Sequence, residues 1–120
     1  MTVLQLTGTY LRQEDLMTHP SKIKGNAYER ELVNTAKEAG LDSKRAYASD
    51  GRSLGLHETV DLLIDEKKIQ AKRRKSIAAF MQPTQHVDAV AIRQDRGETL
   101  IVITLNEYLE LIKRTKDGIR

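Results

Sequence analysis

The sequence predicts an α/β protein with a mixed central β-sheet of about five strands flanked by helices. Three features of the 120-residue chain support this class. An apolar stripe at helical spacing comes first, several short β-branched runs follow it, and an amphipathic segment comes near the C-terminus. The expected element order is α-β-β-β-α-β-β-α. The length suits one domain with a modest core.

The composition excludes several classes of protein. Hydrophobic residues make up 39% and charged residues 31% of the chain, which is typical of a globular protein. There is no cysteine, so disulfides, zinc–thiolate sites and thiol catalysis are excluded. No apolar run approaches the ~20 residues of a membrane helix, and the N-terminus lacks a signal-peptide pattern. We therefore expect a cytoplasmic protein (host cytoplasm if a virus encodes it) with no membrane partner and no small-molecule cofactor.

The first 23 residues are expected to form an N-terminal arm, and residues 24–120 the main domain. A helix is predicted from Lys24 to Gly40, with Asn26 as N-cap and Glu29 as its capping-box partner. Glu29 lies close to the buried stripe on the helical wheel, so its carboxylate is either a cap or a site residue. The apolar stripe comprises Ala27 or Tyr28 together with Leu32, Val33, Ala36 and Ala39.

A strand over Leu41–Ala48 leads into a Ser- and Gly-rich loop at residues 49–58, of a kind that often carries function. A hairpin is predicted next, with strands Thr59–Ile64 and Ile69–Arg73 joined by a four-residue break.

The hairpin would gather polar side chains on one face. Pairing Ile64 with Ile69 puts Asp61, Gln70 and Lys72 on one face, because side chains alternate along a strand. Any even number of loop residues keeps this result, whereas an odd number destroys it. These three groups could form a metal and water site. They could equally be ordinary polar residues on the wet face of a half-exposed hairpin.

A basic cluster overlaps the second strand. Residues 67–75 hold six cations and no acid, although the net charge of the whole chain is only +3. Such a cluster suits phosphate contacts, for example with nucleic acid. The alternative is a solvated basic edge that discourages aggregation of the sheet.

The rest of the chain is expected to add a short helix, two strands and a last helix. A helix capped by Ser76 would run to Gln82 and stop at Pro83. Phe80 and Met81 of that helix, like Tyr108 of the last helix, are candidate interface residues or ordinary core. The three histidines, His19, His57 and His86, are expected to be surface residues. The two strands are His86–Arg93 and Thr99–Thr104, turning at Asp95–Gly97, and the last helix is Asn106–Arg114, with Tyr108, Leu109, Leu111 and Ile112 inward.

Three segments together resemble archaeal-type Holliday-junction resolvases. They are the run Lys24-Gly-Asn-Ala-Tyr-Glu-Arg-Glu-Leu, the loop ending in Val60-Asp61-Leu-Leu, and Ile69-Gln-Ala-Lys72. These resolvases belong to the restriction-endonuclease-like nucleases, whose core motif is an Asp followed by Glu-Xaa-Lys. The likeness runs from about Lys24 to Arg114. It implies a restriction-endonuclease-like fold and a homodimeric, Mg²⁺-dependent endonuclease that cuts branched DNA, with Mn²⁺ as a substitute ion.

The resemblance also implies roles for individual residues. Glu29 and Asp61 match the metal-binding carboxylates, and Lys72 the catalytic lysine. Gln70 departs from the usual Glu, so the site would have one negative charge fewer and weaker metal affinity. With the backbone carbonyl of Ala71, Gln70 would complete the metal ligands. The expected DNA-binding residues are Lys24, Arg30, Arg45, Arg52, Lys68, Arg73, Arg74 and Lys75, with Ser49 or Ser53 as the catalytic-loop serine.

Two other readings stay open. The Gln-Xaa-Lys motif also occurs in Mrr-like nucleases, which implies a repair-type endonuclease acting on duplex or flapped DNA. Alternatively, Gln70 marks a decayed site in a DNA-binding protein that no longer cuts.

Overall fold

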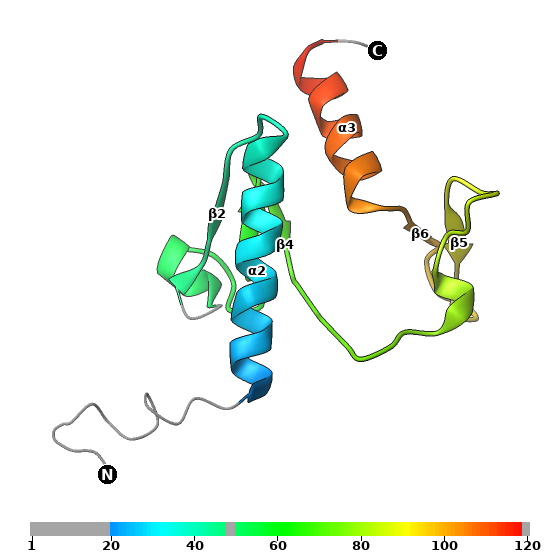
Figure 1. Cartoon of the computed structure of the whole chain (residues 1–120), viewed down its shortest axis with the longest axis horizontal. Coiled ribbons are helices and arrows are strands. Elements are labelled where there is room, and N and C mark those ends of the chain that lie inside the picture. Colours follow the sequence, from blue (N-terminus) through cyan, green and yellow to red (C-terminus); the bar gives the residue numbers. More distant parts are fainter. Residues whose placement is uncertain (1–19, 48–49, 119–120) are drawn as a thin grey trace, which may run out of the picture.

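The computed structural model describes residues 20–47 and 50–118, which form a small α/β protein (Figure 1). Its regular elements follow the predicted order, with a single 3₁₀ turn in place of the middle helix. The elements are α2 (Pro20–Glu38), β2 (Ser43–Arg45), the 3₁₀ turn η2 (Gly51–Leu54), β3 (Leu62–Ile64), β4 (Lys67–Ile69), the 3₁₀ turn η3 (Ala79–Met81), β5 (Val90–Ile92), β6 (Leu100–Val102) and α3 (Leu105–Lys116).

Helix α2 confirms the first predicted helix but begins earlier, at Pro20. Proline suits the first turn of a helix because its φ is already helical and that turn needs no backbone donor. Asn26 therefore lies inside the helix, and its predicted role as N-cap is wrong. The helix also crosses the expected boundary at residue 23, while residues 1–19 of the predicted arm lie outside the described residues.

Strands β2, β3 and β4 form an antiparallel sheet in that order. Helix α2 packs on the face of this sheet that carries Leu62 and Ile64, both of which are almost fully buried. Among the described side chains of α2, the buried apolar ones are Leu32, Val33 and Ala36, as the apolar stripe predicted. Ala27, by contrast, is exposed.

Helix α3 completes the core. Leu109 and Ile112 are buried in the same cluster as the α2 and β3 residues, whereas Leu111, which was expected inside, is 45% exposed. Thr104 caps the helix by accepting a hydrogen bond from the backbone N–H of Glu107 at 3.2 Å. At the other end, Lys116 Nζ donates to Asp65 Oδ1 at 3.0 Å and so joins α3 to the β3–β4 turn.

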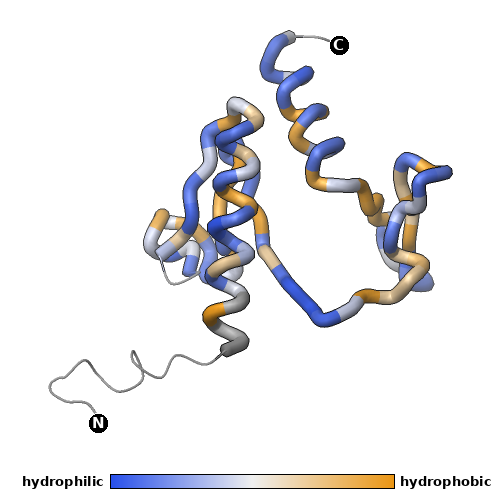
Figure 2. Tube along the Cα trace, in the orientation of Figure 1, coloured by the Kyte–Doolittle hydropathy of each residue, from blue (hydrophilic) through white to orange (hydrophobic). Residues whose placement is uncertain are grey.

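Strands β5 and β6 pair only with each other among the described strands. The single mixed sheet expected from the sequence is therefore wrong for the described residues, because the strands form two antiparallel sheets. A long connection after β4 carries the hairpin away from the first sheet (Figure 1). In Figure 2 this connection begins as a hydrophilic stretch and becomes apolar toward η3. The predicted helix 76–82 is reduced to η3, and Ser76 does not cap it.

None of the described helices combines the length and the apolar character needed to cross a membrane.

Candidate functional site

The candidate site begins at the turn between β3 and β4. Asp65 and Glu66 form a two-residue turn with φ of 49° and 70°, the left-handed backbone that a tight hairpin turn of this kind requires. Ile64 pairs with Lys67 and Leu62 with Ile69, so the predicted pairing of Ile64 with Ile69 is wrong by two residues. The loop is still even in length, but β4 ends at Ile69, so Gln70 and Lys72 lie beyond the paired residues of the hairpin.

Asp61 is held at the start of this hairpin by three backbone contacts. Its own N–H donates to the carbonyl of Ile69 at 2.9 Å, and its carbonyl accepts from Ala46 N–H at 2.8 Å. Its carboxylate Oδ2 accepts from the N–H of Ala71 at 2.7 Å. The residue is only 8% exposed. A buried carboxylate is thus fixed beside the backbone of the segment that carries Gln70 and Lys72.

Glu29 is held in a different way, by an ion pair with β2. The residue is 6% exposed, and its Oε1 accepts from Arg45 Nε at 2.9 Å. Arg45 also donates through Nη2 to Asn26 Oδ1 at 3.2 Å. Arg45, which was expected to bind DNA, therefore points its guanidinium at the N-terminal half of α2. The Glu29 carboxylate is already charge-balanced in this arrangement.

This ion pair should couple α2 to the sheet. We expect Glu29→Gln and Arg45→Met each to lower the free energy of unfolding by about 1–3 kcal/mol, because each change leaves a polar partner half-buried without its counter-charge. The double variant should lose less than the sum of the two single losses. Urea unfolding of the four proteins measures this coupling, and strictly additive losses would show that the pair contributes nothing.

The oxygen donors near Asp61 suit a hard divalent cation. A carboxylate, the side-chain oxygen of Gln70 and a backbone carbonyl at Ala71 are ligands that Mg²⁺ accepts. Across the described residues, no group of three or more His, Cys, Asp or Glu side chains is close enough to bind a metal. The donors named here comprise one carboxylate and neutral oxygens, so water would have to complete the coordination of a cation.

Two hollows lie on either side of Lys72. The first, about 510 Å³, is bounded by the ends of β4 and β6 with α2 and α3, and its wall includes Gln70, Ala71 and Lys72. The second, about 400 Å³, follows the basic segment and includes all four cations from Lys72 to Lys75. Tyr28 and Lys72 are the two residues common to both walls.

A third hollow, of about 740 Å³, lies at the opposite end of the sheet. Its wall has two lysines, Lys37 and Lys44, and two acidic residues, Asp42 and Glu66, so their formal charges balance. None of the described residues of this wall is a predicted site residue.

Most of the predicted DNA-binding cations are accessible. Arg30, Lys68 and the run Lys72–Lys75 are exposed, and the run has no acidic residue within it. The side chain of Lys24 and the whole of Ser49 lie outside the part of the chain that the structure describes.

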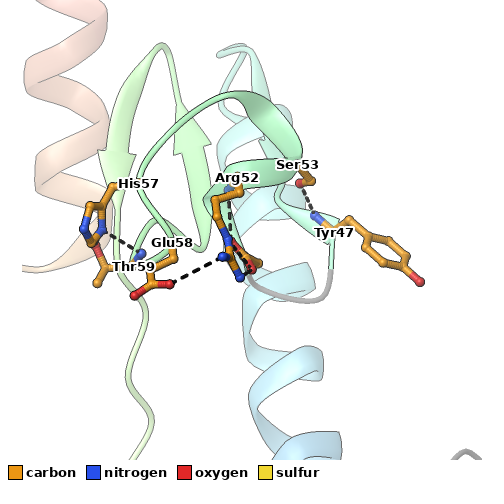
Figure 3. Close-up of polar contacts among 7 residues, drawn as sticks. Tyr47, Arg52, Ser53, His57, Glu58 and Thr59 are labelled. Atoms are coloured by element: carbon orange, nitrogen blue, oxygen red, sulfur yellow. Dashed lines mark hydrogen bonds and ion pairs between the residues drawn. The ribbon is translucent and has the colours of Figure 1, made fainter.

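The loop before Asp61 is held by its own polar contacts (Figure 3). Asp50 caps η2, and its Oδ2 accepts from Arg52 Nη2 at 2.6 Å. The hydrogen bonds from Arg52 hold the pKa of Asp50 below its usual range, and Asp50 in turn raises the pKa of Arg52. Ser53 Oγ accepts from Tyr47 N–H at 2.9 Å. Arg52 is therefore partly neutralised in this structure, and Ser53 anchors the loop.

His57 is the loop's only histidine and makes local contacts (Figure 3). Its Nδ1 accepts from the Thr59 N–H at 3.1 Å, which leaves Nε2 as the protonated nitrogen of the neutral ring. This contact fits the surface role expected from the sequence.

Sequence reasoning assigned Tyr28 to the core stripe alone. The residue is partly buried against the core, but it also lines both hollows beside Lys72. The one sequence signal for a site role of Tyr28 was its position directly before Glu29, within the helical segment that carries the resemblance.

The chain matches no protein-family model, no curated protein is detectably similar to it in sequence, and no solved structure matches its fold.

Proposed function

We propose that this protein is a metal-dependent endodeoxyribonuclease that cuts branched DNA, with the four-way junction as its principal substrate. The observation that carries the proposal is the contact between the buried Asp61 carboxylate and Ala71 N–H at 2.7 Å. This contact brings the Asp and the Gln-Xaa-Lys halves of the motif together across a two-residue turn. The restriction-endonuclease-like fold remains part of the same proposal.

The ligands of a divalent cation would be Asp61, Gln70 and the carbonyl of Ala71. When bound, such an ion activates a water molecule and polarises the scissile phosphate. Lys72 is exposed and begins the basic run, so its ammonium group can approach a phosphate and stabilise the charge that develops on its oxygens. Glu29 contributes by fixing α2 through Arg45, and it would join the site as a direct or water-mediated ligand.

The basic run would hold the DNA backbone. Lys68, Arg73, Arg74 and Lys75 are exposed, and cations that contact phosphates orient DNA without reading its sequence. This kind of contact suits an enzyme that recognises the shape of a branch.

A four-way junction needs two cuts, and a two-fold homodimer would supply two sites. The exposed apolar residues outside the core support a second copy. Phe80, Leu100 and Ile101 are 70%, 58% and 60% exposed, and they lie on η3 and the separate β5–β6 hairpin.

One observation favours a second candidate, a DNA-binding protein that does not cut. The Glu29 carboxylate is paired with Arg45, and among the described residues no third carboxylate joins Asp61. The two functions share the DNA-binding surface and differ in the chemistry at Asp61.

The test compares a labelled four-way junction with a linear duplex of the same sequence, in Mg²⁺, in Mn²⁺ and in EDTA. We expect paired nicks near the branch in either metal, none in EDTA, and cleavage of the duplex at least about tenfold slower. Equal cutting of both DNAs would indicate a repair-type endonuclease. Tight junction binding without cutting in either metal would support the non-catalytic candidate and overturn the enzyme.

A further inference from the structure

The hollow between α2, β4, β6 and α3 differs in character from the basic hollow beside it. Tyr28, Tyr108, Leu32, Ile69 and Leu105 contribute to its wall, so most of its surface is aromatic or aliphatic. Its polar groups are few and come from Gln70, Lys72 and the segment around Thr104. Its volume of about 510 Å³ is within the roughly 300–1,000 Å³ range of small-molecule sites, and this lining is typical of them.

The second hollow supplies the opposite chemistry. Its wall includes Lys72, Arg73, Arg74 and Lys75, and it meets the apolar hollow at Tyr28 and Lys72. Among the described residues of that wall, Glu31 is the one acidic side chain. A ligand that spans both hollows would therefore be flat and apolar at one end and negatively charged at the other.

A nucleotide has this division. We propose that the apolar hollow accepts a single unpaired nucleobase stacked on Tyr28, while Lys72–Lys75 hold the phosphates that flank it. Aromatic side chains beside a cationic groove are the usual means of binding unpaired bases, because every base has a face that can stack. Tyr108 lines the same hollow and provides a second aromatic ring for the base.

This inference rests on the proposed DNA function and narrows its substrate. The preferred DNA would have an unpaired nucleotide at the branch point, where a base costs least to remove from the stack. Tyr28 would be a binding residue next to the cutting site and would take no part in the chemistry.

The test measures binding in EDTA, so that no cleavage occurs. The probes are a branched DNA with one unpaired nucleotide at the branch and the same DNA with an abasic residue at that position. Both probes have the same number of phosphates. For the native protein we expect the unpaired nucleotide to bind about tenfold more tightly than the abasic residue.

Three variants test whether the ring of Tyr28 causes this preference for the unpaired nucleotide. Tyr28→Leu keeps an apolar side chain against the core but loses the ring, so the two probes should bind equally. Tyr28→Phe keeps the ring and should keep the preference. Tyr47→Ala is the matched control, because Tyr47 is 82% exposed and lines neither hollow. Thermal unfolding of each variant checks that its fold is intact.

Equal binding of the two probes by the native protein would overturn the inference, as would an unchanged preference in Tyr28→Leu. The experiments distinguish a failure of the nucleobase site from a failure of the proposed nuclease function. Metal-dependent junction cleavage without a base preference would reject the nucleobase site alone, whereas a tenfold base preference without any cleavage would reject the nuclease alone.

Discussion

Replacing Asp61 by Asn should abolish junction cleavage, with a loss of at least about a hundredfold, while junction binding stays the same or tightens slightly. The amide retains an oxygen that can accept the Ala71 hydrogen bond, so the hairpin should keep its geometry. What disappears is the single negative charge at the proposed cation site. Single-turnover cleavage and a binding titration, each in Mg²⁺ and in EDTA, separate the two effects.

A substitution at Gln70 is the matched variant for this experiment, because it changes the charge at the proposed cation site in the opposite direction. Gln70 directly precedes Ala71, whose N–H binds the Asp61 carboxylate, and it is exposed. Gln70→Glu adds a negative charge where Asp61→Asn removes one, so we expect it to lower the Mg²⁺ concentration needed for half-maximal cleavage. Undiminished cleavage by Asp61→Asn would reject the site. A Gln70→Glu variant that needs more Mg²⁺ would remove Gln70 from the ligand set.

The second large effect is expected at Gly51, in the loop that leads to Asp61. A Cβ built at this position would lie 2.0 Å from the carbonyl oxygen of His57 and 2.8 Å from Cβ of Val60. Both atoms belong to backbone or buried structure, so neither can move aside without shifting the loop. We expect Gly51→Ala to lower the free energy of unfolding by about 3 kcal/mol.

Gly25 is the natural control for Gly51. It lies within α2, and a Cβ there would meet no atom of the described residues within 4 Å. Gly25→Ala should therefore raise the free energy of unfolding by about 1 kcal/mol, because alanine is the better helix former. Urea unfolding measures both variants. If Gly51→Ala were as stable as the native protein, the close packing of this loop against His57 and Val60 would be refuted.

The existence of the central hairpin and the even length of its loop were predictable from the two apolar runs and the charged break between them. Its register was not. The four charged residues between the two apolar runs do not show which of them form the turn. Asp65 and Glu66 form it alone, although neither is the asparagine or glycine that usually adopts positive φ in such a turn. Lys67 and Lys68 then belong to β4.

Helices α2 and α3 were predicted from their apolar stripes, although the α3 stripe wrongly placed the exposed Leu111 inside. The other errors in these two helices concern features that a stripe does not report. The start of α2 at Pro20 lies before the first residue of the stripe, inside the segment expected to form the arm. The Arg45–Glu29–Asn26 network could not be foreseen, because it depends on which side of the sheet α2 packs against. Likewise, strand-like runs at Val90–Ile92 and Leu100–Val102 do not indicate which sheet they join.

The composition of the core also constrains how this protein folds while it is being synthesised on the ribosome. Helix α2 and the three-stranded sheet are complete once Ile69 has emerged, yet their buried face is covered in part by Leu109 and Ile112 of α3. Domains fold as units during synthesis, from the N-terminal side first. Here the nascent chain must carry an open apolar face until α3 has also been released, so that interval is when the protein most needs a chaperone.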